Sequence, residues 1–214
     1  MLKRIHLKKI YNIQELWLRI VEKSDEKAFE ELFYALNSRL IKFGLFYVHQ
    51  KEVAEEIVSD VFVKVWTQRQ DLKHVRKAET YLFISVKNLA LNHIKKFSSI
   101  HIVALEDSTL HLVDTHCPDV EMEKRELIFK LNQAIDSLPR QCRIIFRLVK
   151  DDGMKYKDVA LILGISQRTV QTQLFRAMKK LNLIMLPYIK SDLLSPNTHI
   201  LLSIAFFVLL SLVF

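Results

Sequence analysis

Only three glycines and four prolines occur among the 214 residues of this chain. Turns and sheets consume these residues, so their scarcity favours long helices joined by few breaks. Half of the residues are hydrophobic, which is enough for packed cores and argues against general disorder. The length suits one large domain or two small ones. We therefore expect an all-α protein.

The positive charge is divided into two blocks. The net charge is +8, with 18 Lys and Arg against 12 Asp and Glu over residues 1–97, and 14 against 7 over residues 121–190. Residues 98–120 carry four acids and no Lys or Arg. This arrangement suggests two modules that bind polyanions and a linker of different purpose. A basic surface that serves only solubility is the alternative interpretation.

Hydrophobic spacing predicts three helices in the first block. The first begins at Asp25, with Ser24 as its N-cap, and its apolar residues recur at intervals of three and four. The second covers residues 51–68 and has a wide apolar stripe opposite a mostly acidic face. The third covers residues 78–97 and contains no acid in its last three turns. A helical bundle with one basic outer face is the expected result.

The second block begins after a segment without periodicity. Residues 98–120 are acidic and contain Ser, Thr and His, so they predict an irregular linker. Helices resume over residues 120–137, and Pro139 fits the first position of the next helix, where its missing N–H costs nothing. Residues 151–153, Asp-Asp-Gly, predict a turn.

The strongest local signal predicts a helix-turn-helix. A short helix over residues 156–163 is followed by Gly164, which permits a tight turn, and by Ser166, which can cap the next helix. The buried face of that next helix is expected to contain Val170, Leu174 and Met178. Its other face presents polar and basic side chains: Gln167, Arg168, Thr169, Gln171, Thr172, Arg176, Lys179 and Lys180.

This second face has the chemistry of a DNA reader. Arg and Gln recognise base edges in the major groove, and Lys binds phosphate. No acid occurs between Ser166 and Lys180 to repel the DNA backbone. The turn, the cap, the apolar row and the acid-free face favour DNA binding over an ordinary helix pair with a solvated polar face.

Four segments occur in a fixed order: AFEELFYAL, EEIVSDVFVKVW, TYLFISVKNLALNHIKK and LPRQCRIIFRLVKDDGMKYKDVALILGISQRTVQTQLFRAMKKL. Together they resemble the extracytoplasmic-function (ECF) class of the sigma-70 family, over residues 20–185. The resemblance implies two small helical domains: sigma region 2 over residues 1–97 and the region 4 helix-turn-helix over residues 121–188. A linker over residues 98–120 joins them, and residues 189–214 form a hydrophobic tail.

The resemblance also implies a function. Such a protein is an alternative sigma factor, which is not an enzyme and directs core RNA polymerase to particular promoters. Its expected partners are promoter DNA, the beta-prime clamp and beta flap of the core polymerase, and an anti-sigma factor. Promoter sequence preference does not transfer, because Asn92, Lys95 and Lys96 stand where the family often has an aspartate or arginine.

The resemblance assigns three sets of site residues. The −35 promoter element is expected to contact the polar face of the recognition helix named above. The −10 element is expected to contact Lys87, Asn88, Asn92, Lys95 and Lys96, and the polar loop over residues 70–77 is expected to help capture an unstacked base. The core polymerase is expected to contact Glu56, Asp60 and Trp66, although Trp66 is equally suited to the core.

We expect no cofactor and no metal. The nearest cluster of ligand-type residues is His111, His116 and Cys117, and no second Cys-rich or His-rich half completes a tetrahedral site. Cys117 and Cys142 lack CxxC spacing and are expected to be free thiols in a reducing cytosol.

The tail leaves three arrangements open. Residues 200–214 carry no charge, and as a helix they span about 22 Å, less than a hydrocarbon core of about 30 Å. They can associate with the inner membrane, dock in an apolar groove of a partner, or fold back on the domains. The chain is expected to be cytoplasmic, with the tail as its route to the inner membrane.

Two other functions fit parts of the sequence. A helix-turn-helix transcriptional regulator that acts independently of the polymerase core would bind specific duplex DNA by itself. A membrane-tethered helical adaptor would turn its basic faces toward lipid or a protein partner instead of DNA.

Overall fold

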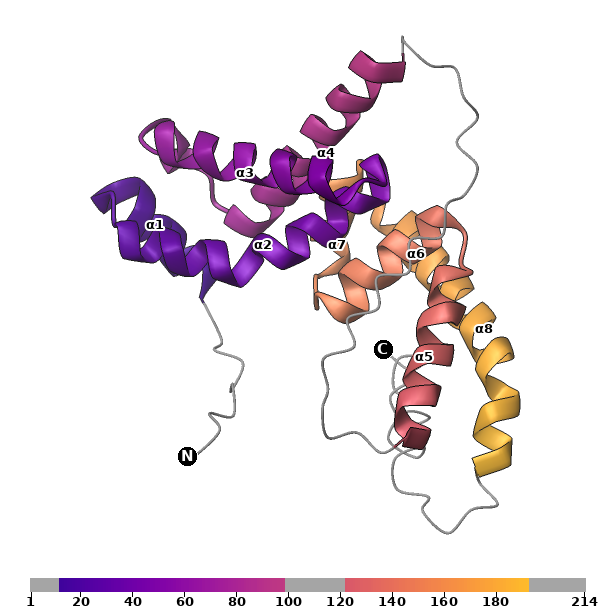
Figure 1. Ribbon diagram of the computed structural model, residues 1–214. Helices are drawn as coiled ribbons and strands as arrows, with labels where there is room; N and C mark the ends of the chain where they lie inside the picture. Colours follow the sequence, from indigo (N-terminus) through magenta and orange to yellow (C-terminus); the bar gives the residue numbers. More distant parts are fainter. Residues whose placement is uncertain (1–11, 99–121, 193–214) are drawn as a thin grey trace, which may run out of the picture. The chain divides into compact units, whose positions relative to one another are not determined.

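A computed structural model of the chain describes residues 12–98 and 122–192, which form helices and short turns with no strand in either range (Figure 1). The all-α prediction is therefore confirmed. The predicted linker, beyond Ser98, and the hydrophobic run over residues 200–214 lie outside the described residues. The described helices form two compact units: α1–α4 make up the first, and α5, α6, α8 and the first part of α7 belong to the second.

The first unit is a helical bundle. Its elements are α1 (Ile13–Lys23), α2 (Glu26–Val48), α3 (Lys51–Thr67), the 3-10 helix η1 (Asp71–His74) and α4 (Ala78–Ser98). Helix α2 packs against α1, α3 and α4, and therefore lies at the centre of the bundle. The core contains fully buried side chains from all four α-helices: Trp17, Ile20, Leu32, Leu36, Leu40, Val58, Leu82, Phe83 and Val86.

The start of this unit differs from the sequence prediction. Helix α1 was not predicted, and Ser24 ends it in the left-handed region at φ 52° instead of capping α2. Asp25 is the N-cap of α2, where its side chain accepts from the Ala28 backbone N–H at 3.0 Å. Arg19 donates to the same carboxylate through Nε and Nη2, at 2.9 and 2.7 Å. The Ala28 N–H first, and the Arg19 guanidinium second, lower the pKa of Asp25.

The second unit is built on a long C-terminal helix. Its elements are α5 (Met122–Asp136), α6 (Arg140–Phe146), the π-helix η2 (Arg147–Asp151), α7 (Tyr156–Leu163) and α8 (Gln167–Asp192). Helix α8 packs against α5 and α6. Pro139 occupies the N-cap position of α6, one residue before the position that its sequence predicted. The predicted turn is present, with Gly153 at φ 68°.

No helix in the two described ranges is both long enough and apolar enough to cross a membrane.

Candidate nucleic-acid interface

The helix-turn-helix has the local structure that its sequence predicts. Gly164 adopts φ 71°, a left-handed conformation that glycine permits at no steric cost. The Ile165 N–H donates to the Ala160 carbonyl at 3.0 Å and closes the end of α7. Ser166 then caps α8, because its Oγ accepts from the Thr169 backbone N–H at 3.0 Å. The turn therefore fixes where α8 begins.

The buried residues of α8 are spaced by both three and four positions, whereas the sequence predicted steps of four only. The fully or nearly fully buried residues of this helix are Val170, Leu174, Ala177, Leu181 and Met185. Met178, which was predicted to lie in this row, is only half-buried. The reason is geometric, because steps of four advance beyond the 3.6 residues of each turn and one step of three restores the register.

The opposite side of α8 presents the polar face. Six of the predicted DNA contacts are exposed: Gln167, Arg168, Gln171, Thr172, Arg176 and Lys179. Thr169 is half-buried, with its hydroxyl 2.8 Å from that of Ser166. The Thr172 hydroxyl donates to the Arg168 carbonyl at 2.9 Å, so this donor is used within the helix. Lys180 is also exposed, but its ammonium donates to the Ser137 carbonyl at 2.6 Å.

Phe175 is the residue of this face that the sequence analysis missed. Its side chain is 59% exposed. At about 100° per residue it lies on the same strip of α8 as Arg168, Gln171 and Lys179. The signal was available, because a phenylalanine one position after the buried Leu174 must point away from the core. An exposed aromatic ring among donors suits apolar contact with a thymine methyl group.

Cys142 lies beneath another part of α8. It is buried, and its Sγ donates to Gln173 Oε1 at 2.9 Å. Burial raises the pKa of this thiol, and the positive charges of Arg176 and Lys180 oppose that shift. The raised pKa keeps the thiol protonated at neutral pH, which is the form that can donate the hydrogen bond.

The second candidate face is the outer side of α4. Leu82, Phe83, Val86 and Ala90 are buried on its inner side. Asn88, Asn92, Lys95 and Lys96 are exposed and lie within about 100° of one another around the helix axis. Lys87 is half-buried, unlike the other four, and lies at the edge of this face, about 80° around the axis from Lys95.

The loop before α4 is braced by α1. Leu72 is buried within η1, while the polar residues around it are exposed. Gln14 Oε1 accepts from the Ala78 backbone N–H at 3.2 Å, which satisfies one donor at the start of α4. Arg39, on α2, pairs at 2.6 Å with Glu79 in the first turn of α4. The predicted base-capture loop is therefore a short, anchored connection.

The predicted polymerase contacts divide into two places. Glu56 and Asp60 are exposed one turn apart on α3, and Val63 beside them is 60% exposed. Trp66 lies about 120° around the helix from Asp60. Its ring packs against Phe29, with centroids 5.1 Å apart, and the Arg69 guanidinium lies 4.4 Å above it. Trp66 thus has a structural role in joining α2 and α3.

Within the described residues, no group of three or more His, Cys, Asp or Glu side chains is placed to hold a metal ion. The candidates His111, His116 and Cys117 lie outside those residues.

The fold and its two faces define a class of protein: a two-unit helical protein with a basic, exposed, acid-free helix surface in each unit. Comparison with known families agrees with this description. Residues 32–99 match the family description "Sigma-70 region 2", and residues 128–181 match "Sigma-70, region 4". Together these matches cover more than half of the chain.

Curated relatives belong to the same family. The chain is 22% identical over 178 residues to the RNA polymerase sigma-H factor of Pseudomonas aeruginosa, covering 79% of this chain and 92% of the relative. It is 25% identical over 178 residues to the ECF RNA polymerase sigma-E factor of Escherichia coli, covering 79% and 93%. The chain belongs to the sigma-70 family, in its ECF class. It is an alternative sigma factor, a non-enzymatic transcription-initiation factor that directs RNA polymerase to promoters.

Two solved structures share the fold. CnrH in complex with the cytosolic domain of CnrY has a TM-score of 0.53 and 17% sequence identity, covering 81% of this chain and 97% of that chain. The sigma factor RpoE in complex with the anti-sigma factor NepR, from Bartonella quintana, has a TM-score of 0.53 and 19% identity, covering 74% and 97%.

Proposed function

We propose that this sigma factor uses α8 to read the −35 element, the outer face of α4 to engage the −10 element, and α3 to bind core polymerase. The observation that supports it best is the pair of exposed, acid-free faces on α4 and α8, one in each family-matched segment. Under this proposal the domains are region 2 over residues 1–97 and region 4 over residues 121–188.

The face of α8 combines three kinds of contact. Arg168 and Arg176 can donate two hydrogen bonds to a guanine edge, and Gln171 can pair with adenine. Phe175 supplies an apolar surface between them for thymine. Lys179 follows one turn later and binds phosphate, which adds affinity without sequence information. The face therefore contains both readers and a backbone anchor.

The face of α4 suits a melted strand. Asn88 and Asn92 can bond base edges, while Lys95 and Lys96 neutralise phosphate. The loop over residues 70–77 borders the start of this helix and is proposed to hold an unstacked base. Opening a duplex costs a few kcal/mol per base, so a rigid, anchored loop is better suited to offset it than a mobile one.

Reconstituted transcription tests the whole proposal. Purified bacterial core polymerase, with and without this protein, is supplied with DNA from upstream of its own gene. Discrete start sites that appear only with the protein are expected, and they locate the promoter used in the experiments below. Tight binding of duplex DNA without polymerase, and no stimulation of transcription, would instead favour an independent helix-turn-helix regulator.

We further propose an anti-sigma partner and a membrane route. Both related solved structures are complexes, one with the cytosolic domain of CnrY and one with the anti-sigma factor NepR. The uncharged run over residues 200–214 supplies apolar surface for association with the inner membrane. Deletion of residues 193–214 is expected to move the protein from the membrane fraction to the supernatant after cell lysis. An unchanged distribution would eliminate the membrane route.

A further inference from the structure

One flank of α8 is attached to the rest of its unit by two hydrogen bonds. Gln173 Oε1 accepts from the Cys142 thiol at 2.9 Å, and Lys180 Nζ donates to the Ser137 carbonyl at 2.6 Å. Gln173 and Lys180 are seven residues apart, which places them two turns apart and within about 20° of each other around the axis. Lys179 lies about 100° from Lys180, on the strip with Arg168. The attached flank thus lies apart from the strip with Arg168 and Lys179, and adjoins the DNA face on the side of Arg176.

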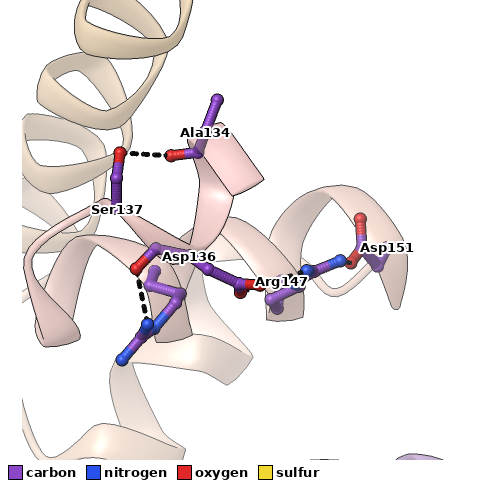
Figure 2. A network of polar contacts seen from close by, with 6 residues as sticks. Ala134, Asp136, Ser137, Arg147 and Asp151 are labelled. Atoms are coloured by element: carbon purple, nitrogen blue, oxygen red, sulfur yellow. Dashed lines mark hydrogen bonds and ion pairs between the residues drawn. The ribbon is translucent and has the colours of Figure 1, made fainter. Parts of the chain in front are cut away.

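The carbonyl that receives Lys180 belongs to the turn between α5 and α6. Figure 2 shows the polar contacts of this turn. The Ser137 hydroxyl donates to the Ala134 carbonyl at 2.7 Å, and Arg143 Nη1 donates to the Asp136 carbonyl at 2.6 Å. The Asp136 carboxylate lies 3.7 Å from Arg147 Nη2, and Arg147 Nη1 lies 2.8 Å from Asp151. These contacts connect the turn to α5, α6 and η2, so the Ser137 carbonyl lies in a well-anchored segment.

We infer that Gln173 and Lys180 are positioning residues that set the rotation of the recognition helix about its own axis, and that Lys180 acts through the Ser137 carbonyl and not through DNA phosphate. This inference rests on the proposed role of α8 in reading the −35 element. Two attachment points two turns apart resist rotation and sliding together. The buried apolar row of α8 holds the helix in its unit by close packing, and the two hydrogen bonds add directional contacts along one flank.

Rotation matters more for base recognition than for phosphate binding. A bidentate contact needs its donors within about 0.5 Å and 10–20° of the productive geometry. A lysine on a flexible four-carbon stem tolerates larger displacements when it holds a phosphate. Loss of the attachments should therefore lower sequence discrimination and leave the electrostatic part of binding intact.

The adjacent lysines provide a matched test. Holoenzyme is assembled from core polymerase and the full chain carrying Lys180→Met or Lys179→Met, and its affinity is measured at several salt concentrations. The probes are the promoter found by transcription and the same fragment with a scrambled −35 element. Lys180→Met is expected to lower the preference for the promoter about five- to tenfold and to leave the salt slope unchanged. Lys179→Met is expected to lower the slope by about 0.9 and to keep the preference.

A second variant removes the other attachment. Gln173→Leu keeps most of the side-chain volume and removes the acceptor of the Cys142 thiol, so it is expected to lower the preference in the same direction as Lys180→Met. Lys180→Gln keeps a hydrogen-bond donor without the charge and is expected to retain more of the preference than Lys180→Met.

The outcomes distinguish failure of the positioning role of Gln173 and Lys180 from failure of the proposed role of α8 in reading DNA. If Lys180→Met lowers the salt slope as much as Lys179→Met does, Lys180 is a phosphate contact and the inference is wrong, while α8 remains a DNA reader. An unchanged preference in both Lys180→Met and Gln173→Leu overturns it as well. If instead the wild-type holoenzyme does not distinguish the promoter from the scrambled fragment, the proposed role of α8 itself fails.

Discussion

Replacement of both Arg168 and Arg176 by glutamate is expected to abolish promoter-specific transcription by the reconstituted polymerase while leaving assembly with core polymerase intact. Both side chains are exposed on the recognition helix, and the substitution places two carboxylates where DNA phosphates and guanine acceptors would lie. Each change removes favourable contacts and adds like-charge repulsion. The single change Arg168→Ala is expected to cost about 1–3 kcal/mol of promoter-specific binding. The double reversal should exceed a hundredfold loss.

A control with the same change in net charge shows whether position matters. Lys27 and Lys51 are exposed in the first turns of α2 and α3, where glutamate is compatible with the helix dipole. Lys27→Glu with Lys51→Glu should retain most transcription. Start-site mapping and a core-binding assay are measured for both pairs. If the Arg168 and Arg176 reversal transcribes like the control, α8 does not read DNA, and promoter selection must depend on other residues of the sigma factor.

The helices were predictable where apolar spacing and capping residues in the local sequence determine them. The spacing of apolar residues predicted α3 and α4 to within one or two residues, and it predicted both bounds of α7. The role of Gly164 follows from its lack of a side chain and that of Ser166 from its hydroxyl, so the turn was predictable as well. Local signals of this kind do not depend on a distant part of the chain.

Helix α1 could not be predicted from the local sequence. It has only 11 residues, and a helix of this length is marginal in water without tertiary contacts. Trp17 supplies such contacts, since it is fully buried with its ring centroid 5.6 Å from that of Tyr81 on α4. If α1 is not considered, Ser24 and Asp25 are both acceptable N-caps for α2. The preceding helix decides between them by placing Ser24 in the left-handed region.

The sequence predicted which face of the helix carries the candidate site, but not what each side chain on that face contacts. The helical period places Lys179 and Lys180 on α8 without showing that α6 and its preceding turn lie beside one flank. Only the packed structure reveals that Lys180 already has an acceptor. In the same way, the sequence made Trp66 equally suited to core and interface. The structure adds its contacts with Phe29 and Arg69, while its side chain is half-buried and its polymerase contact stays a prediction.

The second large effect is expected on α3, where Asp60→Arg should prevent assembly with core polymerase. Asp60 and Glu56 form an exposed acidic pair beside the exposed Val63, so this face offers an apolar side chain with charged groups at its rim. If this face meets basic groups on the polymerase, reversal replaces attraction with a like-charge contact that costs several kcal/mol. The loss of holoenzyme should exceed about a hundredfold in a pull-down or fluorescence titration with purified core.

Glu55 supplies the control for this experiment. It is an exposed acid on the same helix, about 140° around the axis from Asp60, and pairs with Lys51 at 3.6 Å. Such an exposed pair contributes little to stability, so Glu55→Arg should leave both folding and assembly nearly unchanged. Equal losses in the two variants would mean that general charge, and not this face, governs assembly. Loss with Asp60→Arg alone would place the polymerase on the side of α3 that carries Glu56, Asp60 and Val63.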